Sequence, residues 1–188
     1  MILSPSMGNR VCLELRGSNL PILVEEDEKD VAWLTSNNGL PLFWIALLRE
    51  KDLSGPWEEG IRAAFADPEK FLVEPLRLDW REARANLASA RSRAEARLPE
   101  LFPLLQAWEA GLLTLADRGP AQELRLDLAE YANFHENADA FLEELRRGVH
   151  LWHGGSRFGV PTVTNIGRDL IGFNGLTDES FPATLPAW

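Results

Sequence analysis

The chain has 188 residues, a formal net charge of −10 and a sequence pI of about 4.8. Hydrophobic residues make up 45% and charged residues 26% of it, which is typical of a folded domain and not of a disordered chain. The strong negative charge disfavours nucleic acids and anionic membrane surfaces as partners, and it favours basic proteins.

The sequence favours a reducing compartment. It has a single cysteine, Cys12, so no disulfide can form within the chain. Residues 1–6 (MILSPS) lack the basic start and the apolar stretch of a signal peptide. The apolar run at 39–48 has ten residues, which is too short to cross a bilayer. We therefore expect a cytoplasmic protein with no membrane partner.

The start of the chain predicts short strands. Apolar and polar side chains alternate at 11–15 (VCLEL), as in a half-buried strand, and further short strands are predicted at 22–24 and 31–36. Turn residues separate the first two of these segments. The pattern indicates a small antiparallel sheet near the N-terminus.

Residues 37–48, NNGLPLFWIALL, predict a buried helix. An asparagine can cap the helix, and Pro41 suits its first turn because the missing N–H is no loss there. The residues that follow are apolar on nearly all faces, which is typical of a central helix. We expect Phe43 and Trp44 to be core residues. The alternative is that they line a groove for a partner or ligand.

The rest of the chain predicts mostly helices. Pro99 interrupts two long amphipathic segments, and such a short break favours an antiparallel helical hairpin. Pro75 inside residues 71–78 favours an edge strand or a bend there. The predicted elements are helices at 56–66, 80–98, 100–117 and 137–152, an extended segment at 71–78 and a strand at 123–129.

The order of these elements predicts one α+β domain, with a small N-terminal antiparallel sheet packed on the helical hairpin and on further helices. We expect this domain to cover residues 7–188 and residues 1–6 to be an extension. Within this domain, residues 154–188 form a tail rich in glycine and proline. The tail either lacks regular structure or contains a small hairpin around TVTNIGRDLIGF.

The histidines are the best candidates for a metal site. His150 and His153 are three residues apart, so on a helix both could reach one ion, and His135 is the third histidine of the chain. A zinc site would also need a carboxylate, such as Glu130 or Glu136. However, H-x-x-H is a weak motif, and histidines at a helix C-terminus often cap carbonyls. We expect no metal and no cofactor.

Other catalytic signals are weak. There is no G-x-S-x-G motif, Cys12 lies in a predicted strand, and GGSRFG at 154–159 follows a helix where a dinucleotide-binding loop would precede one. We therefore expect no catalytic residue, and the sequence favours a protein that is not an enzyme.

Two charged segments could bind partners. Six arginines crowd the first long helix and its start, and we interpret them as a solvated face with i,i+4 ion pairs and not as a nucleic-acid site. They are Arg77, Arg81, Arg84, Arg91, Arg93 and Arg97. The run EEDEKD at 25–30 is either a solvated loop or a recognition element for a basic protein. Its candidate partner-binding residues are Glu25, Glu26, Asp27, Glu28 and Asp30.

Three segments resemble a group of small uncharacterised bacterial proteins that open with M-x-N-R and place an Asn-rich turn before a P-L-x-W-x-A-L helix. They are MGNR at 7–10, NNGLPLFWIALL at 37–48 and LRLDLAEYANFHENADAFLEELRRG at 124–148. The resemblance implies an α+β domain of bacterial origin from Met7 to about Gly154, with Met7 as the natural start. It implies no activity and no catalytic residue.

These observations together predict a protein-binding module of the bacterial cytoplasm, and in its specific form an immunity protein that neutralises a cognate basic toxin. The first alternative is a small metal-dependent enzyme that uses His135, His150 and His153. The second is a structural homo-oligomer, for example a dimer, in which Trp44 or Trp152 faces a second copy.

Overall fold

The computed structural model describes residues 10–17, 31–37, 39–117 and 121–154. The acidic run at 25–30, the predicted strand at 22–24, the extension at 1–6 and the tail beyond Gly154 lie outside these ranges. The elements follow the chain in the order β1 (Arg10–Gly17), β2 (Val31–Asn37), α1 (Leu42–Ile45), the 3-10 turn η1 (Glu50–Leu53), α2 (Pro56–Ala66), β3 (Leu76–Asp79), α3 (Trp80–Arg97), α4 (Phe102–Asp117), β4 (Ala121–Asp127), α5 (Ala129–Ala132) and α6 (Ala138–His153).

The strands form one antiparallel four-stranded sheet in the order β2-β1-β4-β3. This confirms the predicted α+β class. The extended segment at 71–78 contributes only its last part as β3, and β3 is an edge strand, as Pro75 suggested. The sheet combines two N-terminal strands with two from later in the chain.

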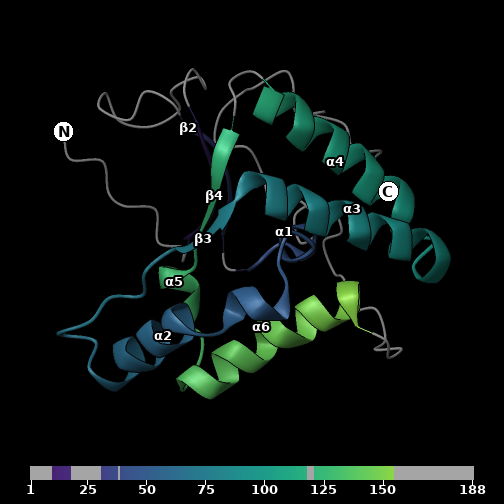
Figure 1. The fold of residues 1–188 in the computed structure, drawn as a ribbon. Coiled ribbons are helices and arrows are strands. Elements are labelled where there is room, and N and C mark those ends of the chain that lie inside the picture. The colour runs from purple at the N-terminus through teal and green to yellow at the C-terminus, as the bar shows by residue number, and fades with distance from the viewer. Residues whose placement is uncertain (1–9, 18–30, 38, 118–120, 155–188) are drawn as a thin grey trace.

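The two faces of the sheet differ in chemistry. One face carries buried leucines and valine from β1 and β4, and it packs on the helices. The opposite face carries charged side chains, among which Glu14 accepts a hydrogen bond from Arg16 (2.9 Å) and lies 3.5 Å from Arg125. Figure 1 shows α3 and α4 on one side of the sheet, α2 and α5 below its lower end, and α6 running beneath α3. The alternation of side chains along each strand therefore decides where the core forms.

The helical hairpin is present as α3 and α4. Asp79 begins α3, because its carboxylate accepts a hydrogen bond from the backbone N–H of Arg81 (2.7 Å). Across the hairpin, Arg91 donates to the buried carboxylate of Glu109 (2.9 Å). Leucines of α4 belong to the buried core, and α3 is the helix of the hairpin that contacts β4.

The apolar segment 41–48 lies at the centre of the core. Phe43 and Trp44 are both 0% exposed, which confirms that they are core residues. Phe43 lies between Trp108 of α4 and Trp152 of α6, with ring centroids 5.8 and 5.9 Å away. The Nε1–H of Trp152 donates to the carbonyl of Leu42 (2.9 Å), which satisfies the one polar atom of that indole.

The helical part of this segment is shorter than predicted. α1 spans only Leu42–Ile45, Pro41 is its N-cap, and no side chain caps it. The prediction of an asparagine cap was wrong, because Asn37 is still part of β2. A segment surrounded by core on all sides gains its stability from burial, so it does not need a long helix to be held in place.

Candidate functional site

The structure separates the three histidines. His150 and His153 lie in the last turn of α6, whereas His135 follows α5 and its Nε2 contacts the carboxylate of Glu144. Among the described residues, no group of three or more His, Cys, Asp and Glu side chains could hold a metal ion. The three-histidine alternative therefore has no assembled site in this part of the chain.

Three of the α3 arginines make tertiary contacts. Arg91 binds Glu109 of α4, and the guanidinium groups of Arg93 and Arg97 donate to the carbonyl of Gly154 at the end of α6 (2.9 and 3.1 Å). Arg93 and Arg97 are exposed, as expected of a solvated face, but the partners of these three residues are not the predicted i,i+4 ones. Sequence spacing can reveal partners on the same helix only, and here the partners belong to other helices.

Cys12 is unsuited to act as a nucleophile. Burial raises the pKa of its thiol to about 11, and the nearby carboxylates of Asp127 and Glu14 raise it as well. The thiol therefore stays protonated at neutral pH and has little reactivity.

The most distinctive surface of the described chain is a groove between the end of α2, the loop that follows it and α5. It encloses about 390 Å³. Its lining is mostly apolar and consists of Ala64, Phe65, Pro68, Phe71, Leu72, Val73, Ala129, Ala132, Asn133 and His135. We call this feature the apolar groove.

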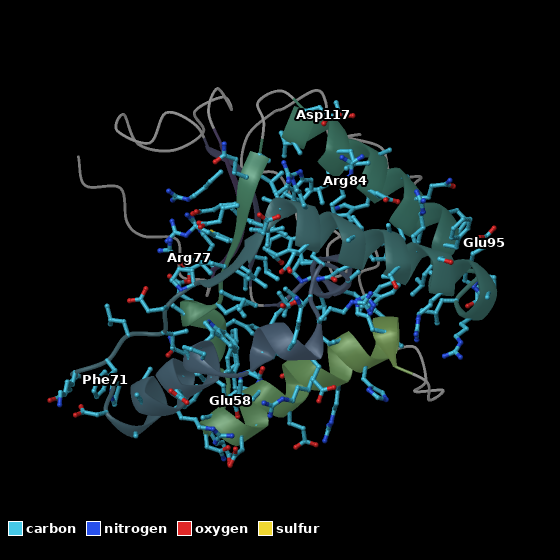
Figure 2. The ribbon with its side chains drawn as sticks, in the orientation of Figure 1. Glu58, Phe71, Arg77, Arg84, Glu95 and Asp117 are labelled. Carbon is cyan, nitrogen blue, oxygen red and sulfur yellow. The ribbon has the colours of Figure 1, made fainter. Side chains whose placement is uncertain are left out.

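The large exposed hydrophobic side chains of the described residues gather here. Phe71 is 42% exposed, Leu72 is 76% exposed and Phe134 is 51% exposed. Phe71 and Leu72 line the groove, and Phe134 lies between two of its lining residues in the chain. Figure 2 shows Phe71 on the loop that follows α2, at one end of the molecule. Single exposed apolar residues are common, but a cluster of them at one hollow makes that hollow a candidate site.

A packed aromatic cluster supports the groove from below. The ring of Phe141 lies 6.0 Å from Phe65 and 5.2 Å from His135, measured between centroids. The hydroxyl of Tyr131 donates to Glu144 (2.7 Å), and burial and this hydrogen bond both raise the pKa of Tyr131. Because these side chains hold one another in place, the floor of the groove is preformed.

The loop between α2 and β3 is also held in a defined conformation. The backbone N–H of Phe71 donates to the carbonyl of Asp67 (3.0 Å), and the Nε1–H of Trp57 donates to the carbonyl of Glu74 (3.0 Å). These bonds fix both ends of the segment that carries Phe71 and Leu72. The exposure of the two side chains thus follows from an ordered loop.

The rim of the groove is acidic. In the loop 67–74, Lys70 is the one basic residue, and it lies over the ring of Phe71 at 5.0 Å from its centroid. Four exposed carboxylates, each next to a lining residue in the chain, have no ion-pair partner among the described residues. They are Asp67, Glu69, Glu74 and Glu136. The groove therefore combines an apolar floor with a negative field.

The sequence pattern predicts one extended segment over residues 71–78, so it does not reveal this site. The signal was present in Pro68 and Pro75, which interrupt regular structure at both ends of EKFLVE. Two large apolar residues in a segment that can be neither a helix nor a strand cannot be assigned to a core face. Such residues are candidates for an exposed contact.

Comparison with known protein families, with curated proteins and with solved structures finds no match to this chain. Within the described ranges, no helix has both the length and the apolar character needed to cross a membrane.

Proposed function

We propose that this protein is a protein-binding module for a basic partner, and that the apolar groove with its acidic rim is the contact surface. In the specific version, the protein is a bacterial immunity protein of the cytoplasm that neutralises a cognate basic toxin. The resemblance of MGNR and NNGLPLFWIALL to small bacterial proteins agrees with this origin.

The observation that carries the proposal is the coincidence of apolar exposure and uncompensated negative charge at one place. Phe71 and Leu72 offer apolar area, which supplies affinity once water is excluded. Glu69 and Glu74 supply a field that attracts lysine- and arginine-rich surfaces and disfavours acidic ones. A second copy of this chain also has a charge of −10, so a basic protein fits the groove better than a dimer does.

The acidic run at 25–30 extends the same proposal to a second element. Five acids in six residues would raise the rate of encounter with a basic partner. The run lies outside the described residues, and the variants below test it separately from the groove.

The alternative of a homo-oligomer joined through tryptophans needs correction. Trp44 is 0% exposed and Trp152 is 1% exposed, and both are part of the core. Neither indole can face a second copy without partial unfolding. An oligomer would have to use another surface.

The first test is a pull-down from lysate of the source organism at low and moderate salt, read by mass spectrometry. We expect one basic protein, captured in stoichiometric amount and less well as salt rises. The captured protein is then purified, and its affinity for each variant below is measured by calorimetry.

Three sets of variants locate the contact. Phe71→Ser with Leu72→Ser removes the apolar anchors, and Glu69→Lys with Glu74→Lys reverses the rim. A third variant reverses the acidic run by changing Glu25, Glu26, Asp27 and Glu28 to lysine. Matched controls are Ala88→Ser on α3 and Gln106→Lys on α4, which are exposed and do not line the groove.

The outcomes separate clearly. Loss of affinity with the first two sets, and not with the controls, supports the groove as the contact surface. Loss only with the acidic-run variant moves the contact to 25–30 and refutes the groove assignment. If no partner is captured at either salt, or if all variants bind equally well, the protein-binding proposal for this surface fails.

A further inference from the structure

A second hollow lies between η1 and the C-terminal half of α6, away from the apolar groove. It encloses about 660 Å³ and is open to solvent. Its lining is rich in basic side chains and consists of Arg49, Glu50, Lys51, Glu143, Arg146, Arg147, Val149, His150, His153 and Gly154. We call it the basic pocket. Four arginine and lysine side chains face two carboxylates there, in a protein that is acidic as a whole.

Arg49 is the central cation of this pocket. Its Nε donates to the side-chain oxygen of Asn86 (3.1 Å), and the amide of Asn86 in turn donates to the carbonyl of Leu47 (2.9 Å). Asn86 is 7% exposed, so a buried neutral group orients the guanidinium. The carboxylate of Asp52 accepts from the backbone N–H of Arg49 (2.7 Å) and makes no ion pair with its side chain.

The other basic residues of the pocket have acidic partners. Lys51 pairs with Glu82 (3.2 Å), Arg146 pairs with Glu58 (2.8 Å) and Arg147 pairs with Glu143. Within the described part of the chain, no carboxylate lies within ion-pair distance of the Arg49 guanidinium. Arg49 is therefore a half-buried cation without an ion pair, on which Asp52 is the nearby carboxylate that acts through its charge, and its guanidinium can still bind an anion.

Helix C-termini usually repel anions, because the helix dipole has its negative end there. At the end of α6 this repulsion is reduced. The guanidinium of Arg93 donates to the carbonyls of His153 and Gly154, and that of Arg97 donates to Gly154. These two cations cover the last carbonyls of the helix. They therefore offset the negative end of the helix dipole next to the pocket.

The crowding of cations also shifts two pKa values. Burial lowers the pKa of Arg49, and the charge of Arg93 lowers it as well. Burial and the charge of Arg49 also lower the pKa of His153 to about 4, so this ring is neutral and its Nε2–H donates to the carbonyl of Ala46 (3.2 Å). A bound anion would relieve the repulsion among these groups.

We propose that the basic pocket binds a small organic phosphate monoester, with its phosphate on the guanidinium of Arg49 and with Lys51 and His150 as further donors at the rim. The volume matches the range of about 300–1,000 Å³ that small-molecule sites have. A phosphate presents several acceptor oxygens around one centre, so it can accept from Arg49, Lys51 and His150 together, whereas a carboxylate has only two oxygens.

The test uses inorganic phosphate and glycerol 3-phosphate as probes, with sodium chloride at equal ionic strength and citrate as comparators. We expect both phosphates to raise the melting temperature and to bind saturably in calorimetry, with glycerol 3-phosphate the tighter of the two. Sodium chloride has no such effect. Citrate binds more weakly than either phosphate.

Variants assign the binding to Arg49. Arg49→Gln should weaken phosphate binding about 10-fold or more, because it removes a charge-assisted contact. Arg84→Gln is the matched control, since Arg84 is exposed on α3 outside the pocket, as labelled in Figure 2. If Arg49→Gln fails to fold by circular dichroism, the double variant Lys51→Gln, His150→Gln takes its place.

Three results would overturn the proposal. The first is a wild-type protein that responds equally to phosphate and to chloride. The second is binding that survives the pocket variants or is lost equally in Arg84→Gln. The third is tight citrate binding with no phosphate binding, which would assign the pocket to carboxylates.

Discussion

Replacing Phe43 with alanine tests whether the segment 41–48 is the centre of the core. Phe43 is 0% exposed and lies between two tryptophans from different helices. Removing a buried phenylalanine costs about 3–5 kcal/mol of unfolding free energy, which includes the cavity and the lost aromatic contacts. Phe43→Leu keeps most of the volume and should cost about 1–2 kcal/mol.

The assay is urea unfolding followed by circular dichroism, with tryptophan fluorescence as a second probe. Phe71→Ala is the matched control, because it makes the same change at a side chain that is 42% exposed, and it should cost less than about 1 kcal/mol. The slope of the unfolding free energy against urea should stay the same in all three variants.

The reasoning would be refuted if Phe43→Ala and Phe71→Ala differed by less than about 1 kcal/mol. In that case Phe43 would not be buried in solution. The groove alternative for Phe43 and Trp44 would then have to be reconsidered.

Three further predictions follow from the packing and the ionisable groups. Gly148→Ala should lower the unfolding free energy by about 1–3 kcal/mol, because the added Cβ would lie 2.8 Å from Cδ1 of Ile45. Gly60→Ala is the control in the same urea assay. Its added Cβ meets nothing within 4 Å, so this variant should be neutral or stabilising. His153 should stay neutral in NMR titrations down to about pH 5, because its pKa is about 4 in the folded protein and 6.5 in the unfolded chain. The unfolded chain therefore takes up a proton first, so the unfolding free energy should decrease as pH is lowered from 6.5 to 4. The variant His153→Gln should show a smaller decrease. A ring that titrates near pH 6.5 would contradict this. Cys12 should react with iodoacetamide at pH 8 about 100-fold more slowly than a free thiol, and unfolding in urea should restore its reactivity. Because its pKa is about 11 in the folded protein and 9.0 in the unfolded chain, the unfolded chain loses the proton first. The unfolding free energy should therefore decrease as pH rises from about 9 to 11.

The core was predictable where burial alone decides the outcome. A run without a charged side chain, such as LPLFWIALL, has to be buried. Phe43 and Trp44 of this run are indeed buried. The conformation of the run was less predictable. Tertiary packing can hold a buried segment as one turn of helix or as several, and the sequence pattern of the two is the same.

The surface was less predictable, because its contacts join residues far apart in the chain. The spacing of Arg91, Arg93 and Arg97 reveals which residues share a helix, but Glu109 and Gly154 meet them only through the fold. In the same way, the sequence around Arg49 does not reveal that its guanidinium donates to the neutral amide of Asn86. A candidate anion site of this kind becomes visible only when partners can be assigned in space.

The sheet order also constrains how the chain can fold as it is synthesised. β4 lies between β1 and β3, and it pairs Leu126 with Leu13 of β1, which is far from it in the chain. β1 and β2 can pair early, but the other edge of β1 stays open until β4 leaves the ribosome. Contacts between such distant residues form slowly, and an open strand edge promotes aggregation. A nascent chain that stalls before Ala121 therefore exposes a sheet edge that has no partner, and this is the stage at which we expect a chaperone to be needed most.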